Sequence, residues 1–269
     1  MKKMYIILIM ILLASSSFAQ VVEQPLQGSE QFGSDVAIYG DWAVVGNKWH
    51  TEWLAGIEYS GVGMISIYKK TPVGVWEHHQ NIVEGDYIYL SPGSQAGSEY
   101  GFSVDIFSDW IIVGAPHYDS DMQGNIGPDG MAFVYKLNPI TGFWEIASEL
   151  KPEVAVLNSA GCSVSISANW AVIGDYTESH PLLAGGNDVY NIGCAHVYER
   201  VGSDWVYHSK LTASDGWGAA MEGPGMGPGD SFGGAVDVYS NTIAVGAHKQ
   251  GVQNGITDYE GKVYLYEWD

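Results

Sequence analysis

Hydrophobic and polar positions alternate along short segments of this chain, and the same pattern recurs four times. The clearest copy, SEYGFSVDIFSDWIIVGAP, covers residues 98–116. Its first half alternates with a period of two, which predicts a half-buried β-strand. The Ser-Asp pair that follows predicts a tight turn, because such side chains cap nearby backbone groups. The apolar run WIIVG predicts a second, fully buried strand, so each copy should begin with an antiparallel hairpin.

The four copies also share glycine, tyrosine and tryptophan positions. Each copy opens with a glycine, at residues 33, 101, 161 and 233, and an aromatic residue precedes it in all but the third copy, which has Ala160. A third strand runs from a glycine to a tyrosine, as GMISIY, GMAFVY, GCAHVY and GKVYLY. A fourth strand follows a tryptophan in the first three copies, as EHHQNI, EIASEL and VYHSKL.

Four short antiparallel strands cannot bury both faces of their own sheet, and this is how propeller blades are organised. We therefore expect an all-β protein, a β-propeller of four-stranded antiparallel blades. The repeats cover about residues 28–82, 96–150, 158–211 and 229–269. The long, dissimilar loops between the second and third strands and between copies should share one face, which is where function usually resides.

Three stretches resemble FG-GAP repeats, namely FSVDIFSDWIIVGAP, KLTASDG and GDSFGGAVDVYSNTIAVGA. They are similar to the subtype of secreted bacterial proteins and, more distantly, to the blades of integrin alpha-chain propellers. The resemblance covers essentially the whole mature chain. It implies a propeller fold and a role in adhesion or recognition, commonly of proteins or glycans. Integrin-type repeats often carry a calcium loop between their first two strands, and here a tight turn replaces it, so that calcium site is not expected.

The last copy ends after its third strand, at YLYEWD. The segment VVEQPL at residues 21–26 has the length and terminal leucine of a fourth strand, and its Pro25 suits an edge strand. We expect this segment to complete the last blade and close the ring, which would cover an exposed edge. The alternatives are a truncated array, an open array, and a larger ring formed as a homo-oligomer of two chains.

The first residues, MKKMYIILIMILLASSSFAQ, have the features of a secretory signal peptide. Lys2 and Lys3 precede a short apolar run, and Ser17-Phe18-Ala19 forms a small-residue cleavage site. The run is shorter than the roughly 20 residues that span a bilayer, which argues against a membrane anchor. We expect a signal peptide at 1–19 and a mature chain of 20–269 that is secreted or displayed on the cell surface.

Charge and composition narrow the choice of partners. The chain carries 11 Lys and Arg against 31 Asp and Glu, and removing Lys2 and Lys3 leaves 9 − 31 = −22. Such a chain should repel nucleic acid and anionic membrane surfaces and attract cations. Ten tryptophans and 17 tyrosines are available for packing or for binding.

Aromatic residues gather in the long loops together with acids and amides. Rings can stack on the apolar face of a sugar, and Trp and Tyr also dominate protein-binding hot spots. The alternative is that each ring only packs its loop against a blade. The candidate ligand-binding residues are Trp49, Trp53, Tyr59, Tyr118, Tyr176, Tyr190 and Trp217.

One loop, HYDSDMQGNIGPDG, suggests a cation site. Asp119, Asp121 and Asp129 offer oxygen ligands of the kind that calcium prefers, although their spacing does not fit an EF-hand. The sequence contains no metalloprotease, nucleophile-elbow or phosphate-loop motif. We therefore expect a non-catalytic binding module. The alternatives are a carbohydrate-active hydrolase or lyase and a structural component of the cell envelope.

The two cysteines test the predicted strand order. Cys162 opens the first strand of the third copy and Cys194 opens the third strand, with one strand between them. Two strand spacings amount to about 9–10 Å, which exceeds the reach of a disulfide, about 7 Å between Cα atoms. We expect two buried free thiols.

Overall fold

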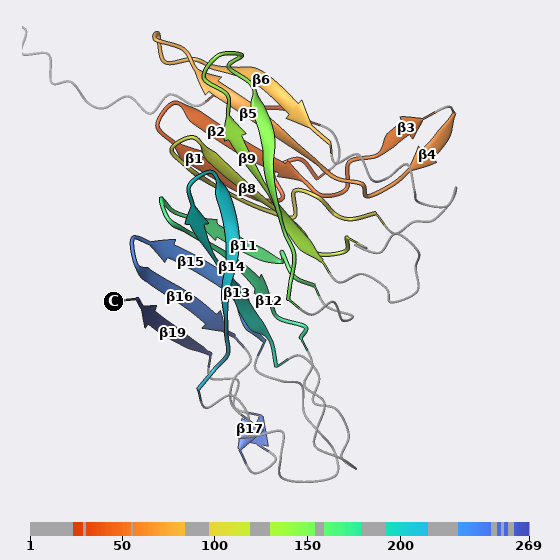
Figure 1. Cartoon of the computed structure of the whole chain (residues 1–269). Coiled ribbons are helices and arrows are strands. Elements are labelled where there is room, and N and C mark those ends of the chain that lie inside the picture. The colour runs from red at the N-terminus through yellow and green to blue at the C-terminus, as the bar shows by residue number, and fades with distance from the viewer. Residues whose placement is uncertain are drawn as a thin grey trace, which may run out of the picture.

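The protein is built from antiparallel β-strands arranged in four successive sheets, the blades (Figure 1). The computed structural model describes residues 24–28, 31–54, 56–83, 97–118, 130–153, 159–178, 192–214, 231–248, 252–253, 256–257 and 261–268. No helix occurs among these residues, and so none is long and apolar enough to cross a membrane. The expected all-β blade architecture is confirmed.

Each of the first three blades has four strands in the order of a meander. Blade 1 comprises β1 (Val36–Tyr39), β2 (Trp42–Asn47), β5 (Met64–Lys70) and β6 (Trp76–Ile82). Blade 2 comprises β7 (Ser103–Phe107), β8 (Trp110–Ala115), β9 (Met131–Leu137) and β10 (Trp144–Leu150). Blade 3 comprises β11 (Ser163–Ile166), β12 (Trp170–Asp175), β13 (Cys194–Val201) and β14 (Asp204–Leu211).

Blade 4 has three described strands, and two short hairpins lie in the loops. Blade 4 comprises β15 (Phe232–Tyr239), β16 (Thr242–Ala247) and β19 (Lys262–Glu267). The hairpin of β3 (Glu52–Leu54) and β4 (Ile57–Tyr59) lies between β2 and β5 of blade 1. The hairpin of β17 (Val252–Gln253) and β18 (Ile256–Thr257) occupies the same place in blade 4.

The hydrophobic core lies between successive blades. Val44, Ile65 and Ile67 of blade 1 form one buried cluster with residues of blade 2 that include Val104 and Ile106. Equivalent clusters join blade 2 to blade 3 and blade 3 to blade 4. Each sheet therefore buries a face only through its neighbour, as a repeat architecture requires.

Glycines allow the blades to approach at the backbone. Parallel bridges join Gly63 to Tyr100, Gly130 to Ala160 and Gly193 to Phe232, so the opening motif of each blade docks on the third strand of the blade before it. A Cβ on Gly114 would collide with the carbonyl oxygen of Gly161, and the same holds for Gly46 and Gly174 with their neighbours. The recurring glycines thus mark one repeated blade junction.

The described part of the 21–26 segment lies against blade 1. The Gln24 side-chain amide donates to the Trp76 carbonyl oxygen at 2.7 Å, and the Trp76 N–H donates to Gln24 Oε1 at 2.9 Å. Residues 21–23 lie outside the described residues. The expected pairing of this segment with the last blade of its own chain is therefore not formed by its described residues.

The strand order around the two cysteines is as expected. Cys162 directly precedes β11, Cys194 begins β13, and β12 lies between these strands. Both side chains are buried and free. The prediction of two buried free thiols is confirmed.

The close backbone approach at the blade junctions predicts that a side chain in place of a junction glycine lowers stability. Gly114→Ala should lower the free energy of unfolding by about 1–3 kcal/mol, because the new methyl group forces blades 2 and 3 apart. Chemical denaturation of the purified chain measures this loss. Ile140→Ala in an exposed turn is the control and should change stability by less than about 0.5 kcal/mol. Equal stability of Gly114→Ala and the wild type would contradict the proposed close approach.

Candidate functional site

Two of the candidate binding aromatics are exposed on one loop of blade 1. Trp49 follows β2 and is 42% exposed, and Trp53 lies in β3 and is 65% exposed. The β3–β4 hairpin projects away from the blades (Figure 1). On this hairpin Trp53 pairs across the strands with Glu58, which places a carboxylate beside the indole. The arrangement offers a flat apolar surface with an adjacent hydrogen-bond acceptor.

The remaining candidates are placed differently. Tyr59 and Tyr118 are buried, and the Tyr118 ring makes an edge-on contact with Phe133 at 5.4 Å, so these two rings pack the loops onto the blades. Tyr176 is partly buried. The other predicted residues lie outside the described residues. They are Tyr190, Trp217 and the calcium candidates Asp119, Asp121 and Asp129.

An ion pair lies on the same loop face, next to blade 2. His117 Nδ1 is 3.3 Å from Glu99 Oε1. The hydrogen bond to Glu99 raises the pKa of His117 above its usual value, although partial burial opposes this. Glu99 itself has a left-handed backbone conformation with φ of 52°, which is uncommon for a non-glycine residue. The pair fixes the start of blade 2 to the end of β8.

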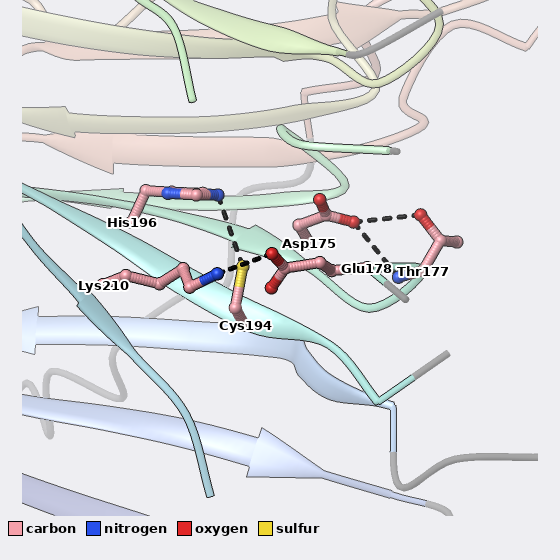
Figure 2. A network of polar contacts seen from close by, with 6 residues as sticks. All are labelled: Asp175, Thr177, Glu178, Cys194, His196 and Lys210. Carbon is pink, nitrogen blue, oxygen red and sulfur yellow. Dashed lines mark hydrogen bonds and ion pairs between the residues drawn. The ribbon is translucent and has the colours of Figure 1, made fainter. Parts of the chain in front are cut away.

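Blade 3 carries a buried cluster of three potential metal ligands. Asp175 and Cys194 lie directly opposite each other in the β12–β13 pairing, and His196 follows two residues later on the same face of β13. Their ligand atoms all lie within 4.8 Å of one another, and all three residues are buried. Figure 2 shows the side chains approaching one another from the two neighbouring strands.

The Asp175 carboxylate is only half satisfied by hydrogen bonds. Its Oδ1 accepts from the Thr177 backbone N–H and from the Thr177 hydroxyl at 2.9 Å (Figure 2), and also from the Ser159 backbone N–H. Its Oδ2 is buried and has no hydrogen-bond partner among the described residues. Burial raises the pKa of Asp175 to about 6, against these hydrogen bonds. A buried carboxylate with an open oxygen is costly unless a donor or cation completes it.

Cys194 and His196 are close enough to be a nucleophile and its base. Cys194 Sγ is 3.3 Å from His196 Nε2. Burial raises the pKa of Cys194 well above its usual value and lowers the pKa of His196 to about 4. The pair therefore stays as thiol and neutral imidazole at neutral pH. Cysteine nucleophiles need the opposite shift, so this geometry does not support nucleophilic catalysis.

A second ion pair flanks the cluster. Lys210 Nζ is 2.6 Å from Glu178 Oε1, and the side chains are 40% and 18% exposed. Glu178 follows Thr177 in the loop after β12, and Figure 2 shows its carboxylate on the side of the Cys194 sulfur. Lys210 is thus neutralised by Glu178.

This cluster was not predicted from the sequence, although the sequence carries a signal for it. The third strand reads GMAFVY in blade 2 and GCAHVY in blade 3, so Met131 and Phe133 are replaced by Cys194 and His196. Likewise Ala115 at the end of β8 corresponds to Asp175. Three polar residues at positions that are apolar in the neighbouring copy break the local pattern, and such breaks are expected at functional or strained sites.

No protein-family model matches the chain, and no curated protein is significantly similar to it.

We expect the contribution of the His117–Glu99 pair to the stability of the fold to depend on pH. Because the folded chain holds the His117 proton more tightly than the unfolded chain, the stabilisation is complete below the usual pKa of 6.5 and is lost as the pH rises through the folded-state pKa. The melting temperature of wild type should exceed that of His117→Gln at low pH, and the gap should shrink on the alkaline side. A gap that is independent of pH would contradict the assignment.

Proposed function

We propose that this chain is a secreted or cell-surface recognition module that binds a protein or carbohydrate partner and performs no catalysis. The observation that carries the proposal is the exposure of Trp53 and Trp49 on the loop face of blade 1. Tryptophan is costly to leave in water and is enriched where a partner covers it. The resemblance of the repeats to FG-GAP propellers, which mediate adhesion, supports the same function.

The form of the site favours stacking recognition. The β3–β4 hairpin carries the Trp53 indole, with Glu58 opposite it on β4. In the same loop, His50 Nε2 and Glu52 Oε1 lie 2.8 Å apart. An indole with a carboxylate beside it can pack against the apolar face of a sugar ring while the acid accepts a hydroxyl hydrogen bond. The net charge of −20 disfavours anionic partners such as nucleic acid.

The main alternative is a hydrolase or lyase on the same scaffold. Such an enzyme needs an accessible carboxyl group with a raised pKa. Among the described residues, the carboxyls with a raised pKa are Asp105 and Asp175. Asp105 bonds to the Ile166 N–H between blades 2 and 3, and Asp175 is fully buried. Both oxygens of Asp105 accept hydrogen bonds, from Ile106, Ser165 and Ile166, and this together with the burial of Asp175 favours structural roles for these two acids.

Binding by the mature chain, residues 20–269, can be tested on a glycan array and by pull-down from cell surfaces. Trp53→Ala should reduce binding by about tenfold or more, because a hot-spot tryptophan contributes about 2 kcal/mol or more. Ile140→Ala, in the exposed turn between β9 and β10, should bind as wild type does. Undiminished binding by a Trp49→Ala/Trp53→Ala double variant would refute this site.

A further inference from the structure

We infer that blade 3 holds a transition-metal ion of the zinc class, bound by Asp175, Cys194 and His196. The donor set is one carboxylate oxygen, one sulfur and one imidazole nitrogen, all within 4.8 Å of one another. These are the ligand types of protein zinc sites. The proposal is independent of the aromatic loop, because the cluster lies inside a different blade.

The distances suit a tetrahedral ion. With Zn–S near 2.3 Å and Zn–N near 2.0 Å, a tetrahedral angle places sulfur and nitrogen about 3.5 Å apart. Cys194 Sγ and His196 Nε2 are 3.3 Å apart. Binding releases the thiol proton of Cys194 to solvent, and the resulting thiolate and the Asp175 carboxylate together balance the charge of a divalent ion.

The open oxygen of Asp175 provides a second reason. The residue is 0% exposed, its Oδ1 is fully used, and its Oδ2 has no hydrogen-bond partner among the described residues. The neighbouring ammonium of Lys210 is paired with Glu178. A cation held by Asp175 Oδ2 would complete this carboxylate.

The ligand types also select the metal. Calcium and magnesium take oxygen ligands almost exclusively, whereas sulfur and imidazole favour zinc and its neighbours. The Glu178 carboxylate lies on the side of the Cys194 sulfur (Figure 2), and its Oε2, which is not the oxygen paired with Lys210, or a water can complete the coordination. We therefore expect that the site does not bind calcium.

Blade 2 supplies the matched control. Replacing Asp175→Ala, Cys194→Met and His196→Phe installs the residues Ala115, Met131 and Phe133 of blade 2 at the same positions, and blade 2 buries all three in an equivalent sheet. Cys162→Ser changes the other buried thiol and leaves the cluster intact. Both variants keep the strand pattern.

The mature chain would be stripped with chelator, incubated with Zn²⁺ or Ca²⁺, dialysed and analysed for bound metal. We expect one tightly bound zinc per chain, no retained calcium, and a zinc affinity lower by about tenfold or more in His196→Phe. With Co²⁺, wild type and Cys162→Ser should show a thiolate-to-cobalt charge-transfer band that the triple variant lacks. Folding is checked by circular dichroism. Failure of the folded wild type to retain zinc, or equal retention by the triple variant, would overturn the proposal.

A second inference rests on the two ends of the array. We propose that blade 4 of one chain docks on blade 1 of a second copy through the same junction that joins blades within the chain. Leu265 and Val263 on β19 are each 70% exposed, whereas the residues equivalent to them, such as Ile65 and Ile67, are 0% exposed. The face of blade 4 that carries Val263 and Leu265, here called its forward face, is thus an uncovered half of a blade junction.

Blade 1 presents the complementary half. Val36 and Ile38 on β1 are 64% and 66% exposed, whereas their counterparts Val104 and Ile106 on β7 are 5% and 4% exposed. In the core between blades 1 and 2, these counterparts pack against Ile65 and neighbouring residues. Blade 1 therefore has the surface that the forward face of blade 4 requires.

Blade 4, at the C-terminal end of the array, also carries the glycines of the junction. Gly246 and Gly261 occupy the positions at which glycine admits the next blade, yet the nearest atoms to a Cβ there are 3.5 Å away. The opening motif Phe32-Gly33 of another copy would fill this space. Ala235 replaces the serine whose hydroxyl bonds the next blade elsewhere, so the new junction lacks that hydrogen bond.

The N-terminal segment has the position of a fourth strand. Gln80 on β6 exchanges two hydrogen bonds with Trp144 of the next blade, at 3.0 and 2.9 Å. Gln24 exchanges the same two bonds with Trp76 of blade 1. The 24–26 segment therefore lies where the outer strand of a preceding blade belongs. A blade 4 docked on blade 1 would receive it beside β19.

A second copy fits this site better than the same chain does. The innermost strands contact one another in the order β1–β7, β7–β11 and β11–β15, and the described residues make no comparable contact between β15 and β1. Closing one chain would alter all three of these uniform junctions. A second copy can instead repeat the junction unchanged, and two such contacts would close a two-fold ring of eight blades.

Light scattering after size exclusion gives the mass of the mature chain, and we expect a dimer. Leu265→Asp should yield monomer, and Ile140→Asp, at a 93% exposed side chain away from the junction, should remain dimeric. The double variant Phe32→Cys/Gly261→Cys copies the Gly193–Phe232 bridge and should give a disulfide-linked dimer under mild oxidation. A monomer without a cross-link, or one with the cross-link inside a single chain, would overturn the proposal.

Discussion

The close backbone approach between successive blades is the interaction on which the rest of the structure depends. Each opening motif docks on the preceding blade at Gly63, Gly130 or Gly193, and a side chain at the partner glycines 46, 114 and 174 would collide with a carbonyl oxygen. This contact sets the spacing at which the apolar faces meet. Because each sheet has no core of its own, the fold is a chain of interfaces.

A structure made of one repeated interface shows its functions as departures from the repeat. The β3–β4 hairpin is an insertion that carries an exposed indole, and the polar cluster of blade 3 replaces apolar residues that blade 2 retains. The apolar residues of the two uncovered faces at the ends correspond to residues that the internal junctions bury. The proposed recognition, metal binding and assembly would each use a different part of the scaffold, so each could change independently.

The repeat was predictable from the sequence because strand period, glycine positions and turn residues are local signals. The strand order followed as well, which is why the free thiols of Cys162 and Cys194 could be predicted. The cluster at Asp175 was not predicted, because its members are distant in sequence and meet only through the β12–β13 register. The aromatic candidates divide between Trp53, which is exposed, and Tyr118, which is buried, because exposure depends on how each loop folds back onto its blade.

Small-angle X-ray scattering of the mature chain tests the central idea, that one junction serves both within and between chains. We expect the scattering of a closed ring with a hollow centre and the mass of two chains, because the uncovered faces of blades 1 and 4 carry the residues that the internal junction buries. A profile that fits the open four-blade array of a single chain would contradict it.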